Sequence, residues 1–420
     1  MDVLTASNEN SALISTINSA EQSQILPFNY ALEKNIPAHG LQIVEHTTVS
    51  GSIGQSKAHD FDINKYGYLR SLVIQCKVTG ASGTAVNTFM GGLGFIESIE
   101  LLSSGRRLQY MSRDAYLCAL SDLPREARKS IENSARMVDS GTFGTSGVKV
   151  FHIPILMSFF DNVRNTVNAR FNEALRLRVT TTDGKHCKAS GSATPAAVTL
   201  TDMTVLAEYR RLPMPLDDKV VQEDFGDNQP LTKVIYDYSE ETALDVTLST
   251  TADTAYKSIE IKDNGAVDAI FLIVQADLKT SSISDAHHKA TQIPLELTDI
   301  KLTASGQTIL EVPARYIEFL GKRTLGNGFY GTGPVDSGSE KAALGFVYKI
   351  QLGLDHDTRY FSNLASLREL NTPTVEFKLA GVTSASGLNS SSGTAKVIVR
   401  KAMLMTTDAS SGKNSVGVSN

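Results

Sequence analysis

Carboxylates and histidines come first, because these side chains most often bind metal ions or transfer protons. The densest group is Asp355-His356-Asp357, whose two carboxylates could bind a hard cation such as Ca²⁺ through oxygen. The same residues are typical of a turn between two elements, which is the commoner role of Asp-rich loops. Asp355 and Asp357 are therefore weak candidates for a metal site, and the sequence offers no stronger one.

The usual motifs of catalysis are missing from the sequence. Its eight histidines and three cysteines contain no His-x-His, His-Glu-x-x-His or Cys-x-x-Cys spacing, which are common metal-site patterns. No Gly-x-Ser-x-Gly nucleophile motif occurs. Residues 326–331 match Gly-x-Gly-x-x-Gly, but a dinucleotide site needs a strand before this motif and a helix after it, and that context is lacking. We therefore expect no catalytic residues, no cofactor and no enzymatic activity.

The composition is that of an ordinary globular protein, with 41% hydrophobic and 20% charged residues. The net charge of −5 provides no basic field, so we expect no direct binding of nucleic acid. Residues 1–24 contain no Lys or Arg and no long apolar run, unlike a signal peptide. Three scattered cysteines argue against a disulfide scaffold.

One stretch occurs twice and organises the chain. Ile99–Leu120 matches Ile300–Leu320, first at an offset of 201 and, after one deleted residue, at an offset of 200. Each copy has the pattern of a strand, a tight Ser-Gly turn, a second strand and a short helix. The residues that anchor the match are Gly105, Tyr116, Gly306 and Tyr316. A period this long exceeds the ~20–50 residues of a solenoid repeat, so it indicates a duplicated domain.

Alternation of apolar and polar residues predicts strands on both sides of this stretch in each copy. Phe61-Asp-Ile63 matches Ile259-Glu-Ile261 at an offset of 198, and Leu175–Val179 matches Val375–Leu379 at an offset of 200. Residues Arg113–Val138 look helical, with an interruption at Leu123-Pro124. Each half should hold about eight strands, and the periodicity itself supports an antiparallel β-sandwich that occurs twice.

Composition and repeat boundaries divide the chain into five parts. Residues 1–39 form an N-terminal arm, 40–212 the first sandwich, 213–232 a Pro-containing acidic linker, 233–406 the second sandwich and 407–420 a flexible Ser/Gly-rich C-terminal tail. The two sandwiches are each large enough to bury a core.

The two halves with their strand–turn–strand–helix unit resemble the double jelly-roll major capsid proteins of tailless double-stranded DNA viruses. Ile153-Pro154-Ile155 followed by Phe171–Leu177 is also similar to that family, in which an apolar-Pro stretch precedes Asn-Glu and a strand. The resemblance covers residues ~40 to ~406 and implies an all-β fold of two tandem eight-stranded jelly rolls with short helices in loops. Short loops suggest a version like that of membrane-containing bacteriophages.

The resemblance implies a place in the virion and a set of partners. Three copies would form a pseudo-hexameric homotrimer that tiles an icosahedral capsid shell. Further partners would be other capsid proteins, such as penton or minor membrane proteins. An internal viral membrane would separate shell from genome, which agrees with the absence of a basic arm. We hypothesise that residues 1–25 face inward and contact that membrane or a neighbouring trimer.

Two other classes of protein remain as alternatives. A bicupin, either a storage protein or an enzyme, is also built from two small β-barrels, but cupin enzymes need a His-x-His metal set that this sequence lacks. A carbohydrate-binding adhesion protein would use exposed aromatic residues, and the chain has no Trp.

Overall fold

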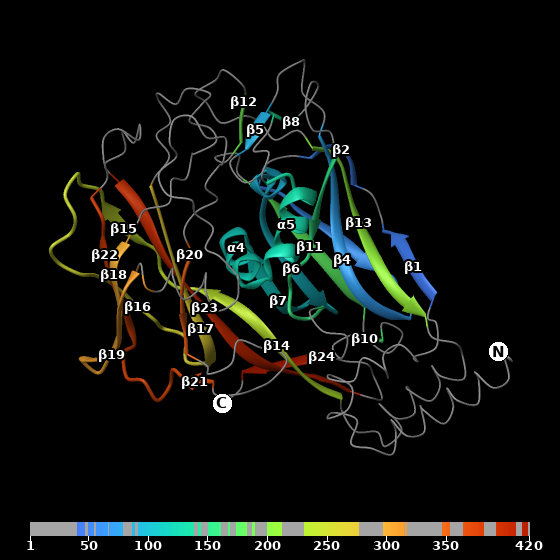
Figure 1. The fold of residues 1–420 in the computed structure, drawn as a ribbon. Coiled ribbons are helices and arrows are strands. Elements are labelled where there is room, and N and C mark those ends of the chain that lie inside the picture. The colour runs from blue at the N-terminus through green and yellow to red at the C-terminus, as the bar shows by residue number, and fades with distance from the viewer. Residues whose placement is uncertain are drawn as a thin grey trace, which may run out of the picture.

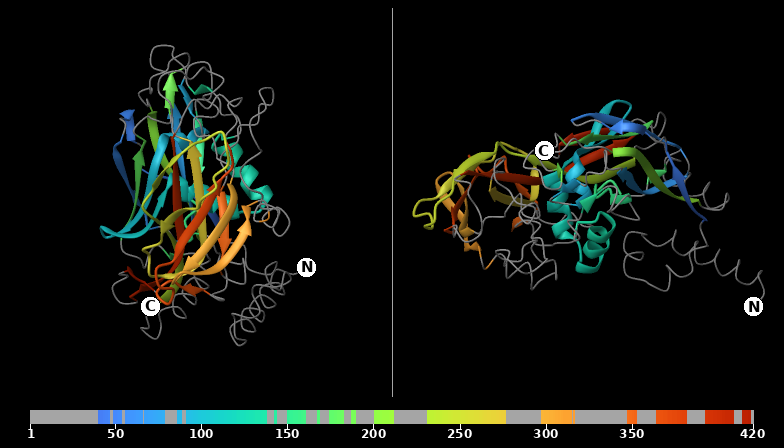
Figure 2. Two further views of the ribbon diagram at one scale, coloured as in Figure 1. Left: turned by 90° about the vertical axis from the view of Figure 1, so that its left-hand side faces the viewer. Right: turned by 90° about the horizontal axis from the view of Figure 1, so that it is seen from above.

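The computed structural model describes most of the two predicted sandwiches. The described residues are 40–46, 49–53, 56–65, 67–78, 86–88, 91–137, 142–143, 150–160, 167–168, 174–182, 187–189, 200–211, 231–276, 297–314, 316, 347–352, 364–381, 392–408 and 414–418. The predicted arm at residues 1–39 and most of the predicted linker lie outside them. Figure 1 and both views of Figure 2 show two β-rich halves side by side.

The first half is a sandwich of two antiparallel sheets. Sheet 1A has the order β1 (Gly40–Glu45), β13 (Leu200–Arg211), β4 (Tyr68–Val78) and β10 (Val167–Asn168), with β2 (Val49–Ile53) on β13 and β9 (Val150–Pro154) on β4. Sheet 1B has the order β3 (Ala58–Ile63), β11 (Leu175–Thr181), β6 (Ile96–Ser103) and β7 (Arg106–Ser112). A small sheet joins β12 (Cys187–Ala189), β5 (Val86–Thr88) and β8 (Thr142–Phe143).

The second half repeats this arrangement. Sheet 2A has the order β14 (Leu231–Glu240), β23 (Ser392–Thr407), β17 (Ala266–Ala276) and β20 (Val347–Gln351). β15 (Leu244–Thr247) and β24 (Asn414–Val418) also pair with β23, and β21 (Ala365–Ser366) pairs with β17. Sheet 2B has the order β16 (Lys257–Glu260), β22 (Thr374–Leu379), β18 (Leu297–Ala304) and β19 (Gln307–Pro313). The predicted all-β double sandwich is thus confirmed.

The two copies of the organising stretch share their turn. Ser104 and Gly105 both have positive φ, at 46° and 82°, and Ser305 and Gly306 repeat this at 52° and 73°. A two-residue turn with positive φ at both positions matches the twist of the strands that it joins. The β6–β7 and β18–β19 hairpins also have a bulge at the same place, after Leu101 and Leu302.

β11 and β22 are equivalent strands, but the sequence match between them is wrong by two residues. Leu177 pairs with Leu101, whereas Val375 pairs with Leu302. Since Leu302 is the counterpart of Leu101, Val375 corresponds to Leu177, and the offset is 375 − 177 = 198 rather than 200. A two-residue slip leaves every side chain on the same face of a strand, so alternation cannot detect it.

Two further predictions need correction. β23 runs to Thr407 and pairs with β24, so residues 414–418 of the predicted flexible tail are a strand. β14 begins at Leu231, so the last two residues of the predicted linker belong to sheet 2A. The described strands in each half also exceed eight, because short strands such as β5 and β21 add to the two main sheets.

The helical prediction for Arg113–Val138 is confirmed as two helices, α4 (Arg113–Asp122) and α5 (Arg125–Ser134), preceded in the chain by the short 3₁₀ helix η2 (Gly91–Phe95). The break falls at Leu123, because a residue before proline is disfavoured in the helical conformation. Among the described residues, no helix is both long and apolar enough to cross a membrane.

The buried side chains do not divide into one core per half. One cluster lies inside the second sandwich and includes Ile270, Phe377 and Val397. The larger cluster fills the first sandwich but also takes in residues of the second half, among them Phe271 and Ile398. Sheet 2A is therefore buried on both faces: one packs on sheet 2B and the other on the first half.

Candidate functional site: the junction between the two jelly rolls

Helix α4 is the element of the first half that lies against sheet 2A. Ser112 caps its N-terminus by accepting a hydrogen bond from the Ala115 N–H at 3.1 Å. Asp114 follows in the first turn, where a carboxylate is favoured by the helix dipole. The helix is buried from Asp114 to Leu120, because the first sandwich packs on one side and sheet 2A on the other.

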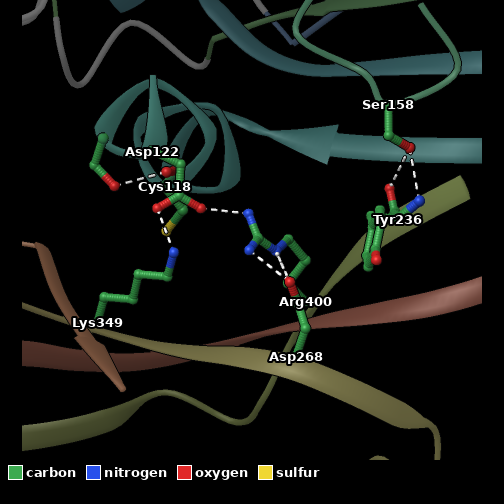
Figure 3. Close-up of polar contacts among 8 residues, drawn as sticks. Cys118, Asp122, Ser158, Tyr236, Asp268, Lys349 and Arg400 are labelled. Carbon is green, nitrogen blue, oxygen red and sulfur yellow. Dashed lines mark hydrogen bonds and ion pairs between the residues drawn. The ribbon is translucent and has the colours of Figure 1, made fainter. Parts of the chain in front are cut away.

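A cluster of four charged side chains crosses the junction (Figure 3). Arg400 of β23 makes a bidentate contact with Asp268 of β17, at 2.9 Å from Nε to Oδ1 and 2.6 Å from Nη2 to Oδ2. Its other terminal nitrogen donates to Asp122 at the end of α4. Asp122 also accepts a hydrogen bond from Lys349 Nζ at 2.6 Å. Two acids and two bases thus tie α4 to three strands of sheet 2A.

The charges of this cluster are mutually stabilised. Burial alone would raise the pKa of Asp122, but the positive charges of Arg400 and Lys349 outweigh it and hold that pKa below its ordinary value. Burial alone would lower the pKa of Arg400, but Asp122 and Asp268 raise it well above its ordinary value. The guanidinium carbon of Arg400 also lies 5.6 Å from the centre of the Phe271 ring, within cation–π range.

Polar contacts extend the junction along β7 and β14. Gln109 donates from Nε2 to the Tyr236 carbonyl at 2.7 Å and to Ser158 Oγ at 2.8 Å. The Tyr110 N–H donates to Asp237 Oδ1 at 3.1 Å, and Ser112 donates to Glu240. Lys396 Nζ contacts Asp114 Oδ2 at 2.5 Å. These directional contacts fix how the edge of one jelly roll meets the edge of the other.

The junction suits a positioning role better than a chemical one. A buried ion pair contributes little net stability compared with apolar packing, yet it penalises any arrangement that leaves one charge unpaired. Cys118, the thiol nearest the cluster, is fully buried, and burial raises its pKa well above the ordinary value. It is therefore a core residue, as the sequence predicts, rather than an activated nucleophile.

The residues singled out from sequence lie elsewhere. Asp355 and Asp357 fall outside the described residues, and the described part of the chain contains no group of three or more potential metal ligands. Gly105 and Gly306 occupy the shared turn described above. Tyr116 is buried and donates to the Pro154 carbonyl at 2.9 Å, whereas Tyr316 is about half exposed.

Sequence reasoning missed the junction residues. The only local signal is a charge inside an apolar run, as at Arg400 after Val397-Ile398-Val399. A buried charge in a strand is rare unless it is paired, so Arg400 could have been marked as a residue with a partner. Its partners Asp268 and Asp122 lie 132 and 278 positions away, which no local pattern can predict.

Comparison with known proteins rests on structure. No family model matches the sequence, and no curated protein matches it. The PBCV-1 protein VP54, fitted into a reconstruction of the virophage Sputnik, is similar with a TM-score of 0.68 and 13% identity, over 91% of this chain and 97% of that one. The Faustovirus major capsid protein gives 0.56 and 9%, over 95% and 98% of the chains.

The mavirus major capsid protein is similar with a TM-score of 0.54 and 10% identity, over 94% of this chain and 95% of that one. At such identities the likeness concerns the fold, and it extends over nearly the whole of each chain. The protein therefore has the double jelly-roll fold of viral major capsid proteins.

Proposed function

We propose that this protein is a major capsid protein that assembles as a homotrimer with a pseudo-hexagonal outline and tiles an icosahedral virion shell. The observation that carries the proposal is the junction: two jelly rolls held in one orientation by buried ion pairs. A subunit that must fit a regular lattice needs such a fixed shape. The fold similarity to viral capsid proteins supports the same function.

The duplication explains why three copies would suffice. Each chain supplies two similar sandwiches, so three chains place six around one axis. A closed ring of head-to-tail contacts needs the same relation between successive units, and a duplicated chain can meet that need approximately. The trimer would then occupy a hexagonal lattice position with three-fold symmetry.

Electron microscopy and light scattering of the purified protein test this proposal. We expect particles of hexagonal outline and a mass of three times 45.3 kDa, or 135.9 kDa. A monomer of 45.3 kDa at micromolar concentration, or a trimer of triangular outline that carries bound metal, would contradict the capsomer and favour a bicupin.

The N-terminal arm would act on the inner side of the shell. Residues 1–25 would contact an internal membrane or a neighbouring trimer, and penton or minor membrane proteins would complete the shell. Deletion of residues 1–24 should leave trimers intact but impair particle assembly in a reconstituted system. Deletion of the C-terminal residues 419–420 serves as the control, and particle assembly that survives the arm deletion would refute this role.

The proposed work is structural and non-catalytic. Subunits would act through complementary surfaces, and nucleic acid would be contained without direct binding. The solved structures to which the fold is similar are viral capsid proteins, which does not favour the bicupin or adhesion alternatives.

A further inference from the structure

The internal junction has a docking side and a receiving side. In the first half, β7 and α4 form the docking side. In the second half, the β14 edge and the outer face of sheet 2A receive them. Because the chain is a duplication, the second half also has a docking side, with β19 in place of β7. The first half likewise has a receiving side, with β1 and sheet 1A in place of β14 and sheet 2A.

The docking side of the second half is exposed where its counterpart is buried. Leu108 and Ile309 are the bulge residues of β7 and β19, since each lies between the matched pairs of its hairpin. Leu108 is 2% exposed in the core that the two halves share, whereas Ile309 is 47% exposed. β19 thus presents an apolar side chain at a position that the internal junction covers.

The receiving side of the first half shows the same contrast. Ile43 of β1 pairs with Glu208, and Tyr238 of β14 pairs with Arg400. These two positions correspond because β4 and β17 have the same bulge beside Glu208 and Arg400. Tyr238 is 7% exposed at the junction, whereas Ile43 is 65% exposed.

The charges at the two receiving sides are reversed. The bulge residue of sheet 2A is Asp268, paired with Arg400, and the bulge residue of sheet 1A is Arg70, which contacts Glu208 at 2.6 Å. Arg400 receives Asp122 of α4. In the sequence, the positions 200 and 201 after Asp122 are Lys322-Arg323, which lie outside the described residues. The sign is therefore reversed in the sequence as well.

From these contrasts we infer that the β19 side of one copy packs against the β1–β13–β4 face of a second copy, as a head-to-tail repeat of the internal junction. The exposed Ile309 of one copy and the exposed Ile43 of the other are then covered by the same contact. The inference rests on the proposed homotrimer and adds which two surfaces build it. Charge complementarity and continuity with the internal junction both identify the occupant as a second copy of this chain.

Two variants test the two sides separately. Ile309→Asp places a charge on the docking side, and Ile43→Asp places one on the receiving side. Both residues are exposed in the single chain, so the fold should persist, as thermal unfolding can verify. The matched control is Leu404→Asp, an apolar residue that is 43% exposed on β23 and belongs to neither surface. We expect both variants to be 45.3 kDa monomers and the control to remain a 135.9 kDa trimer.

Mixing the two monomeric variants gives the decisive result. Ile43→Asp retains an intact docking side, and Ile309→Asp retains an intact receiving side, so one unaltered interface can form between them. Light scattering of the mixture should show a 1:1 heterodimer near 90.6 kDa, twice the chain mass of 45.3 kDa. A mixture that stays monomeric, or single variants that stay trimeric, would overturn the inference while the wild-type trimer stands. A monomeric wild type would overturn the proposed function itself.

Discussion

At the scale of single residues, the decisive feature is a buried charge with several partners. Asp122 joins Arg400 and Lys349 across the junction, so Asp122→Asn leaves two cations facing a neutral amide. Removing one member of a buried charge cluster typically costs about 3–5 kcal/mol. We expect a loss of that order in the free energy of unfolding, measured by urea titration.

The matched control for this variant is Asp62→Asn, because Asp62 makes an equally short contact of 2.7 Å with Arg176 but on an exposed sheet face. Exposed ion pairs contribute far less than buried ones. An equal loss of stability in the two variants would contradict the role assigned to the junction.

The same carboxylate makes stability depend on acid. The pKa of Asp122 in the folded protein lies below its ordinary value, so the group stabilises the fold at pH values above that ordinary value, which is ~4. This contribution disappears as the pH falls through the lowered, folded-state pKa. Urea unfolding at pH 7 and at pH 3 should show a smaller acid loss in Asp122→Asn than in the wild type. Equal acid losses would assign the sensitivity to other carboxylates.

At the scale of elements, glycines at positive φ separate backbone strain from steric conflict. Gly105 and Gly306 have open space where a Cβ would stand, so alanine at either should cost only the left-handed strain, about 1 kcal/mol. Gly91 also has positive φ, but its Cβ would lie 2.2 Å from the Arg136 carbonyl oxygen. Urea titration should therefore rank Gly91→Ala well below the two turn variants in stability. Three equal losses would contradict the predicted conflict.

The elements were largely predictable because their causes are local. Alternation predicts β3, β6 and β11, and the repeated Ser-Gly turn predicts two hairpins that the structure contains. β24 could not be predicted, because its polar Asn-Ser and Gly residues form a strand only by pairing with β23. The junction likewise depends on contacts between distant segments, so the sequence predicts two sandwiches but not the core that they share.

At the scale of the whole molecule, the shared core predicts cooperative unfolding. Phe271 and Ile398 of the second half belong to the cluster that fills the first, so neither half can open without exposing apolar surface of the other. Differential scanning calorimetry should show one transition rather than two. Two resolved transitions, one for each half, would contradict this coupling.

The reversed ion pairs at the two bulges give the subunit a sense of direction. An ancestor with identical halves could have been set into a six-membered ring in either of two phases, one-sixth of a turn apart. With Asp268–Arg400 in one half and Arg70–Glu208 in the other, a subunit placed in the wrong phase would bring like charges together. Under the proposed arrangement, the sign of two charges thus proofreads the orientation of every subunit as the shell grows.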